Sequence, residues 1–466
     1  MTATALQGAD ALIVNVALPQ LGRDLGGGLE LGTWVMTSYL CATAVTAPLT
    51  AWLRRRYGAA RLFHYAVSAF LATSTLCAFA PSGAVLILLR VLQGAAGGII
   101  LPLVQAILLD IYPQERHGRV LGILGAVFML GPILGPLLGG VVTDLASWRA
   151  VFLINLPLGL AALAATRRLY SHEEVGEEPP IDALSVVLLM ITIGALQLCL
   201  ERGVGRSWLE SPELLAEGAA FVVAVAAMTF RARHSGFAVF QPAIFKDINF
   251  AVAAFYNLMT SGLVFVAIVF LPALGQGPLG FSATLAGFTI VPRAILLMLM
   301  LLLAGELIGR VDHRLMLGAG WLLMAGGLAI LADIPAGGGL LWMIVGSTVQ
   351  SLGAGLLFTP HSTLAFTTLA PGLRTDATGL FSLLRQLGYA SGVALMTAVL
   401  RLEFGSHQLA LAGAVPPAEL TDAAKLLAYS DCFRMMAVAS LMMIPGIFLF
   451  RPAAADSAGQ EGAPIG

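Results

Sequence analysis

Long, nearly uninterrupted runs of apolar residues follow one another along the whole chain and are separated by short polar stretches. A helix needs about 20 mostly apolar residues to cross the hydrocarbon layer of a membrane, and these runs have that length. Lipid admits only helices and closed barrels, and the runs alternate too little for barrel strands. The pattern predicts fourteen membrane-spanning helices, at residues 1–21, 34–53, 62–80, 84–108, 118–142, 150–168, 181–200, 213–231, 250–274, 283–308, 315–333, 339–360, 377–400 and 432–450.

The composition is that of an integral membrane protein, with membrane lipids as its surroundings. Of the 466 residues 58% are hydrophobic and only 11% are charged, whereas soluble domains carry roughly 25% charged residues. This composition excludes intrinsic disorder, and a net charge of −1 predicts no nucleic-acid partner. The four cysteines lie far apart and form no CxxC pair, so neither a disulfide framework nor a metal site is predicted.

Basic residues are unequally divided between the two sides of the predicted membrane. If both chain ends lie on one side, the loops of that side and the span ends next to them hold fifteen of the 25 Lys and Arg residues, the opposite loops hold six, and the other four lie within spans. Cytoplasmic loops are normally the more positive ones. We therefore expect an even number of spans and both termini in the cytoplasm.

An internal repeat is visible in the glycines and prolines of the spans. The stretch Gly97–Pro102 returns as Gly355–Pro360 at an offset of 258, and the glycine pair Gly135–Gly139 returns as Gly388–Gly392 at an offset of 253. Secondary transporters are commonly built from two such repeats packed about a central axis. The repeat predicts two homologous six-helix halves with an extra pair of helices between them.

The domain organisation follows from the repeat and from the polar segments between spans. The segment YSHEEVGEEPP is charged and ends in two prolines, as a connector does, and the chain ends in a tail rich in Ala, Gly and Pro. We predict a six-helix bundle at 1–169, a cytoplasmic linker at 170–180, an inserted pair of helices at 181–232, a second six-helix bundle at 249–451 and a disordered tail at 452–466.

Four ionisable residues lie deep inside the predicted spans, where a charge is most costly: Asp10, Arg90, Arg293 and Arg385. Such residues usually face a cavity or a partner. Arg434, close to Asp431, is interpreted as an interfacial anchor instead. Burial disfavours the charged form of a carboxylate and a nearby arginine favours it, so Asp10 is suited to take up and release a proton as its surroundings change. The alternative is a static Asp10–Arg90 ion pair that holds two helices together.

Ionisable residues also occur at the ends of spans. Glu306 and Asp333 lie at such ends, and we expect their side chains to reach water. His64 and His361 also lie at predicted span ends. For these histidines an interfacial position is favoured over a role as a proton relay.

The strongest local signal is the run GPILGPLLGG in the fifth span. Glycines four residues apart permit close helix contact in a membrane, and prolines remove backbone donors and bend the helix. We interpret the run as a dense, bent helix that seals one half of the molecule against the other, with close packing alone as the alternative. The residues concerned are Gly131, Pro132, Gly135, Pro136, Gly139 and Gly140.

Together these motifs resemble the fourteen-span drug:proton antiporters of the major facilitator superfamily, of the EmrB/QacA type. The segments DALIVNVALP and LRVLQG resemble the family's span-1 and span-4 signatures, and the glycine–proline run resembles its span-5 antiporter motif. The matching segments lie at 10–19, 34–39, 89–94, 131–140, 148–159 and 385–388. Arg293 has no counterpart in this pattern.

The resemblance implies an all-α integral membrane protein with the major facilitator fold, two six-helix bundles plus two inserted helices. It implies that Asp10 and Arg90 carry the proton coupling and that 131–140 is the antiporter motif. No cofactor, metal or catalytic residue is expected, since the proton gradient is the energy source. Candidates for lining the substrate cavity are Asn15, Gln93, Gln105, Arg293 and Arg385.

The expected function is proton-driven export of hydrophobic or amphipathic compounds by alternating access, from the inner membrane of a bacterium. The absence of an acid in the middle of the tenth span and the buried arginines favour neutral or anionic lipophilic substrates. The resemblance also implies a periplasmic adaptor protein as partner, although the loop at 401–431 is short for such docking.

Two alternatives stay open at this point. One is a dedicated exporter of a single lipid or metabolite on the same fold. The other is a membrane-embedded enzyme, for which the chain offers no GxSxG, HExxH, P-loop or GxGxxG motif.

Overall fold

The computed structural model describes residues 1–26, 28–166, 183–203, 211–234, 242–335, 339–412 and 415–450. Within these residues the chain is built from helices, with two isolated bridges and no strand. Each of the fourteen predicted spans coincides with a helix or with a helix that is interrupted once. The predicted linker 170–180 and tail 452–466 lie outside the described residues.

The first helix group precedes the gap at 167–182. It comprises α1 (Thr2–Asp24), α2 (Gly28–Thr46), α3 (Thr50–Tyr57), α4 (Ala59–Ala78), α5 (Gly83–Ile111), the short helix η1 (Gln114–Arg116), α6 (His117–Leu145), α7 (Trp148–Leu153) and α8 (Asn155–Thr166).

A pair of helices follows, and then the second helix group. The pair is α9 (Ala183–Gly203) and α10 (Pro212–His234). The second group comprises η2 (Pro242–Lys246), α11 (Ile248–Gln276), α12 (Ala283–Phe288), α13 (Ile290–Leu307), α14 (His313–Ala332), α15 (Gly339–Thr367), η3 (Pro371–Leu373), α16 (Arg374–Leu411), α17 (Pro417–Met442) and η4 (Ile444–Leu449).

Four predicted spans are interrupted, and each interruption lies next to a proline. Proline has no N–H to donate to the carbonyl four residues before it and disfavours helical backbone at the preceding residue. Pro48 lies between α2 and α3, and Pro157 follows the break between α7 and α8. Pro292 lies just after the break that precedes α13, and Pro445 lies just after the break that follows α17.

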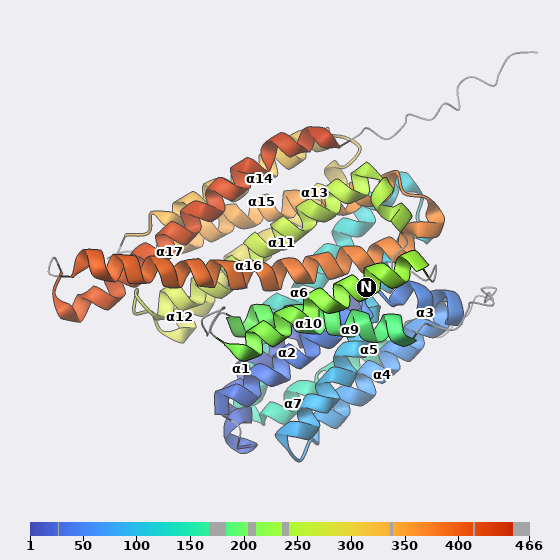
Figure 1. Cartoon of the computed structure of the whole chain (residues 1–466), viewed down its shortest axis with the longest axis horizontal. Helices are drawn as coiled ribbons and strands as arrows, with labels where there is room; N and C mark the ends of the chain where they lie inside the picture. Colours follow the sequence, from blue (N-terminus) through green and yellow to red (C-terminus); the bar gives the residue numbers. More distant parts are fainter. Residues whose placement is uncertain are drawn as a thin grey trace, which may run out of the picture.

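The two groups repeat one packing scheme. In the first group α1 packs on α6, and α2 and α4 pack on α5; in the second group α11 packs on α16, and α13 and α14 pack on α15. In Figure 1 the first group, coloured blue to cyan, lies along one side of the molecule, and the second, yellow to red, along the other. Helix α9 contacts α10 and also one helix from each group, α2 and α16.

The helices have the length and composition of membrane spans. Among the described residues nine helices are long and apolar enough to cross a membrane, and residues 184–199 of α9 form a shorter apolar helix. The protein is therefore a multi-pass membrane protein. That the chain crosses the membrane fourteen times stays a prediction, and so do the domain boundaries given above.

Ion pairs join the two groups at one end of the molecule, which we call the arginine-rich end. Arg55 Nη1 of α3 lies 2.9 Å from Asp376 Oδ2 at the start of α16. Arg119 Nε of α6 lies 2.6 Å from Glu306 Oε1 at the end of α13, and both side chains are partly exposed. Water screens the exposed Arg119–Glu306 pair, so its contribution is mainly to alignment.

Close backbone packing reinforces the same end. A Cβ atom on Gly122 of α6 would lie 2.7 Å from the Leu301 carbonyl oxygen of α13, and Gly305 of α13 is equally tight against α6. Gly379 of α16 likewise faces the Ala47 carbonyl, with 2.7 Å left for a Cβ atom. Small residues let helix backbones approach this closely. The two groups are thus in close contact at the arginine-rich end.

Candidate transport site

Asp10 is held at the centre of a buried polar cluster in the first group. Arg90 Nη1 of α5 donates a hydrogen bond to Asp10 Oδ2 at 2.7 Å, and neither side chain has any exposed surface. Gln93, one turn along α5, donates from Nε2 to Asp10 Oδ1 at 2.9 Å and accepts from Arg90 at 2.8 Å. Asp10 and Arg90 therefore form the ion pair that the sequence suggested, and Gln93 is hydrogen-bonded to both of them.

Two further helices complete this cluster. Asn155, the first residue of α8, donates from Nδ2 to Asp10 Oδ1 at 2.7 Å and to Ser74 Oγ of α4 at 2.9 Å. The Arg90 guanidinium lies over the ring of Tyr39, 4.1 Å from its centroid, and Arg90 Nε donates to the Val35 carbonyl at 3.4 Å. Helices α1, α2, α4, α5 and α8 are therefore tied together through one carboxyl group.

The chemistry of the cluster follows from its donors. The Asp10 carboxylate accepts N–H groups from Arg90, Gln93 and Asn155, and the Arg90 guanidinium is its counter-charge. A proton arriving at Asp10 would remove the charge that Arg90 faces.

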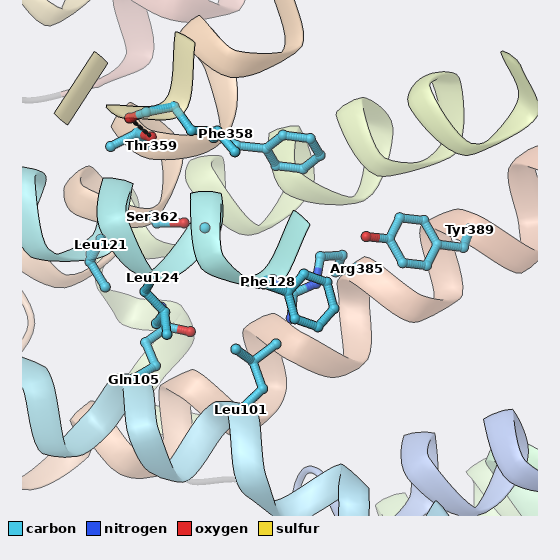
Figure 2. Close-up of a pocket in the computed structure, with 12 residues that line it drawn as sticks. Leu101, Gln105, Leu121, Leu124, Phe128, Phe358, Thr359, Ser362, Arg385 and Tyr389 are labelled. Atoms are coloured by element: carbon cyan, nitrogen blue, oxygen red, sulfur yellow. Dashed lines mark hydrogen bonds between the residues drawn. The ribbon is translucent and has the colours of Figure 1, made fainter. Parts of the chain in front are cut away.

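A second polar site lies between the two helix groups. A cavity of about 60 Å³ is lined from α5 and α6 of the first group and from α13, α15 and α16 of the second. Figure 2 shows side chains from these helices converging on it. The lining residues are Leu101, Gln105, Leu121, Leu124, Gly125, Phe128, Leu301, Phe358, Thr359, Ser362, Arg385 and Tyr389.

The size and polarity of this cavity constrain what it can hold. Drug-sized ligands need roughly 300–1,000 Å³, so in this conformation the cavity has room for a few water molecules only. Among the described lining residues only Arg385 carries a charge, and its guanidinium lies 5.7 Å from the Phe128 ring centroid. Gln105, Ser362 and Tyr389 add neutral polar groups. The lining is therefore mostly apolar, with one positive charge and a few neutral polar groups.

Arg293 lies inside the second group, away from the described cavity lining. Its side chain is 2% exposed and joins α13 to two neighbouring helices, donating to Ser351 Oγ at 3.0 Å and to the Val264 carbonyl at 3.0 Å. Nη1 has no hydrogen-bond partner among the described residues. Arg293 is absent from the described cavity lining.

The predicted site residues thus separate into distinct places. Gln105 and Arg385 line the cavity, Gln93 belongs to the Asp10 cluster, and Arg293 packs within the second group. The side chain of Asn15 lies outside the described residues.

The glycine–proline run of α6 has a different packing partner from the one we expected. Gly131 packs on Gly8 and Ala9, and a Cβ atom on Gly139 would lie 2.7 Å from the Ile13 carbonyl oxygen. These contacts are with α1, within the first group, so the described glycines support the alternative of close packing; that the helix seals one half against the other stays a prediction. The side chains of Pro132 and Pro136, and Gly140, lie outside the described residues.

The equivalent glycines of α16 do the same in the second group. Gly388 packs against Leu258, and a Cβ atom on Gly392 would lie 2.7 Å from Gly262 Cα, both on α11. The glycine pairs of the repeat therefore fix the first helix of each group against the helix of its fifth span. The glycines that lie at the contact between the groups are Gly122, Gly305 and Gly379.

Predictions for the residues at span ends had mixed outcomes. The side chains of Glu306 and Asp333 are 43% and 68% exposed, as expected. His64 is partly exposed and is bonded to the Ala60 carbonyl at 2.7 Å. The interfacial position predicted for His361 is wrong, because its side chain is fully buried beside Tyr256, with ring centroids 5.3 Å apart. Helix α15 continues seven residues past the predicted end of its span, to Thr367, and so carries His361 into the packed interior.

Sequence reasoning did not assign Asn155, Ser74 or Tyr39 to the site. Asn155 and Tyr39 fall in segments that matched family signatures, and Ser74 is a lone hydroxyl in an apolar run. The signal was present as buried polar residues, but helices α4 and α8 had to be packed before their partner was visible.

The fold and the two polar sites define an all-helical secondary transporter rather than an enzyme. The sequence model of the Major Facilitator Superfamily matches residues 1–393, and the chain belongs to this superfamily.

Relatives cover most of the chain. It is 32% identical over 397 residues to the multidrug export protein EmrB of Haemophilus influenzae, which covers 85% of this chain and 78% of that protein. It is 31% identical over 421 residues to EmrB of Escherichia coli K12 (89% and 81%). It is 30% identical over 418 residues to the fatty acid resistance protein FarB of Neisseria gonorrhoeae (88% and 82%).

A solved structure supports the fold. The human organic anion transporter MFSD10 superimposes with a TM-score of 0.65 over 97% of each chain, at 15% sequence identity. At that identity the likeness concerns the fold alone.

Proposed function

We propose that this protein is a proton-coupled multidrug efflux transporter that exports hydrophobic or amphipathic compounds by alternating access. The observation that carries the proposal is the Asp10–Arg90 pair, a titratable carboxyl group without water contact inside a membrane helix bundle. The relatives named multidrug export protein EmrB support the substrate breadth. The energy source is the proton gradient, without a cofactor.

The proposed coupling uses the change of charge on Asp10. While Asp10 is ionised, Arg90, Gln93 and Asn155 hold α1 against α5 and α8. When Asp10 takes a proton, Arg90 loses its counter-charge and these helices are free to shift. Because α1 is packed along α6 through Gly131 and Gly139, the shift carries α6, which lines the cavity.

The proposed substrates are neutral or anionic lipophilic compounds, including weak acids. Arg385 is the charged group of the cavity lining, and Phe128, Phe358 and Tyr389 supply apolar surface around it. A cationic substrate would meet a like charge there, which opposes its binding. The relative named fatty acid resistance protein FarB is consistent with such substrates.

The same relative favours a second candidate function, the dedicated export of one lipid or metabolite. The fold, the coupling and the cavity would be the same. Growth of a deletion strain on a panel of unrelated toxic compounds separates the two, because a dedicated exporter protects against one chemical class only.

The proposed location is the inner membrane of a bacterium, with both termini and the arginine-rich end in the cytoplasm. The excess of basic residues on that side supports this orientation. A periplasmic adaptor protein is proposed as an additional partner, in keeping with the resemblance to EmrB-type proteins.

Reconstitution in liposomes tests the proposal. Purified protein receives an imposed pH gradient, and transport of a lipophilic weak acid and of a neutral dye is followed by fluorescence. We expect wild-type protein to transport both and Asp10→Asn to lose gradient-driven transport.

Asp24→Asn is the matched control, because Asp24 lies on the same helix and its side chain is 46% exposed. Gradient-driven transport by Asp10→Asn at the wild-type rate would refute the coupling role. Transport of neither compound by the wild-type protein would refute the substrate class.

A further inference from the structure

Three side chains with metal-ligating atoms meet where α16 and α17 pack together. Glu403 and His407 are four residues apart on α16 and so share one face of that helix, and Asp431 faces them from α17. Their ligand atoms all lie within 4.8 Å of one another. His407 Nε2 and Asp431 Oδ2 are 2.6 Å apart, within hydrogen-bond distance.

The cluster lies far from the transport site, near the C-terminal end of α16, the longest of the described helices. Helix α16 has 38 residues, or about 57 Å at 1.5 Å per residue, whereas the hydrocarbon layer measures about 30 Å. Its start carries Asp376 at the arginine-rich end, so Glu403 and His407 lie toward the opposite end. Figure 1 shows α16 and α17 forming a projecting tip there.

The cluster is accessible to ions from the aqueous phase. The side chains of His407 and Asp431 are 25% and 28% exposed, and Glu403 is also partly exposed. A metal ion therefore needs no conformational opening to reach the three ligands.

The surrounding charges leave the cluster negative. Arg434 lies 3.4 Å from Asp431 Oδ1 and 3.2 Å from Asp333 Oδ1, so one cation is shared between two carboxylates. Glu403 adds a third carboxylate, and its described side-chain contact is the neutral hydroxyl of Ser406 at 3.3 Å. With neutral His407 the local charge is −2, which a divalent cation would cancel.

We propose that Glu403, His407 and Asp431 form a binding site for a divalent transition-metal ion of the zinc type, which joins α16 to α17. One imidazole nitrogen and two carboxylate oxygens suit Zn²⁺, with a water molecule in the fourth position. Ca²⁺ and Mg²⁺ prefer oxygen ligands alone. Arg434 holds Oδ1 of Asp431, so Oδ2, which now faces His407 Nε2, would be the oxygen atom that binds the ion.

The competing explanation is a simple hydrogen bond between His407 and Asp431 that tethers the two helices. Glu403 distinguishes the explanations, because its described hydrogen bond is to Ser406 rather than to His407. Replacement of Glu403 leaves the tether intact and removes one metal ligand. Glu419→Gln is the matched control, an exposed glutamate in the first turn of α17.

The test is isothermal titration of the purified full-length protein in detergent with ZnCl₂. We expect one Zn²⁺ per chain in the wild-type protein and in Glu419→Gln. In Glu403→Gln and His407→Ala we expect binding weakened at least about tenfold. Titration with Co²⁺ provides a second readout, because a bound Co²⁺ ion in a four-coordinate site gives visible absorption bands that Glu403→Gln should lose.

Absence of saturable Zn²⁺ binding to the wild-type protein would overturn the proposal. Equal binding by the wild-type protein and Glu403→Gln would overturn it as well. Neither result depends on transport, so this test is separate from that of the proposed function.

Discussion

The two helix groups each bury an arginine, but they satisfy its charge in different ways. In the first group Arg90 faces the Asp10 carboxylate at 2.7 Å and also bonds Gln93. In the second group Arg293 donates hydrogen bonds to the Ser351 hydroxyl and to the Val264 carbonyl. Among the described residues, therefore, Arg90 is paired with a carboxylate, whereas Arg293 is bonded to neutral dipoles.

The internal repeat places the two arginine sites at corresponding positions of the two groups. The offset of 258 that relates the glycine and proline positions of α5 and α15 also relates Gln93 to Ser351. Each of these residues bonds an arginine guanidinium, which comes from α5 in the first group and from α13 in the second. The same scaffold position therefore supports a guanidinium in both groups, but among the described residues a carboxylate is bonded to that guanidinium only in the first. The proposed proton coupling is accordingly assigned to the first group.

Removal of Arg90 should have the largest effect on stability. Arg90→Met leaves Asp10 buried without a counter-charge, and breaking a buried pair in this way typically costs about 3–5 kcal/mol. Denaturant or thermal unfolding of the purified protein in detergent measures the loss.

Arg293→Met is the matched control for that experiment. No carboxylate is bonded to Arg293 among the described residues, so its removal leaves only neutral acceptors without a donor, at a cost of about 1 kcal/mol. Equal losses for the two variants would contradict the difference between the groups.

Glycine substitutions should have smaller effects that are alike in both groups. Gly139→Ala and Gly392→Ala each place a methyl group 2.7 Å from the neighbouring helix, and such overpacking costs about 1–3 kcal/mol. Gly318→Ala in α14, which meets nothing within 4 Å, should instead stabilise by about 0.5–1 kcal/mol. The same unfolding measurement compares all three, and a loss in one group only would argue against equivalent packing.

The sequence was sufficient to predict the helical segments and the meeting of Asp10 with Arg90. Apolar runs report membrane burial directly, and a buried acid requires a buried partner. It was insufficient for the breaks at Pro157 and Pro292, because many membrane helices continue through proline when neighbouring groups satisfy the freed carbonyl.

The direction of each helix face was also beyond the sequence. The spacing of Gly131, Gly135 and Gly139 predicted close contact correctly, but not that the contact is with α1. Arg293 and Arg385 looked alike as arginines within spans, yet only Arg385 lines the described cavity. Such assignments depend on how the helices are rotated in the bundle, which spacing alone leaves undetermined.

Proton release on substrate binding tests the central claim most directly. Purified protein in weakly buffered detergent solution is mixed with a non-titrating neutral substrate, and the pH change is followed with an indicator dye. The account predicts that the wild-type protein releases protons in proportion to the substrate bound. It predicts that Asp10→Asn binds substrate without releasing them, and equal proton release by both proteins would contradict it.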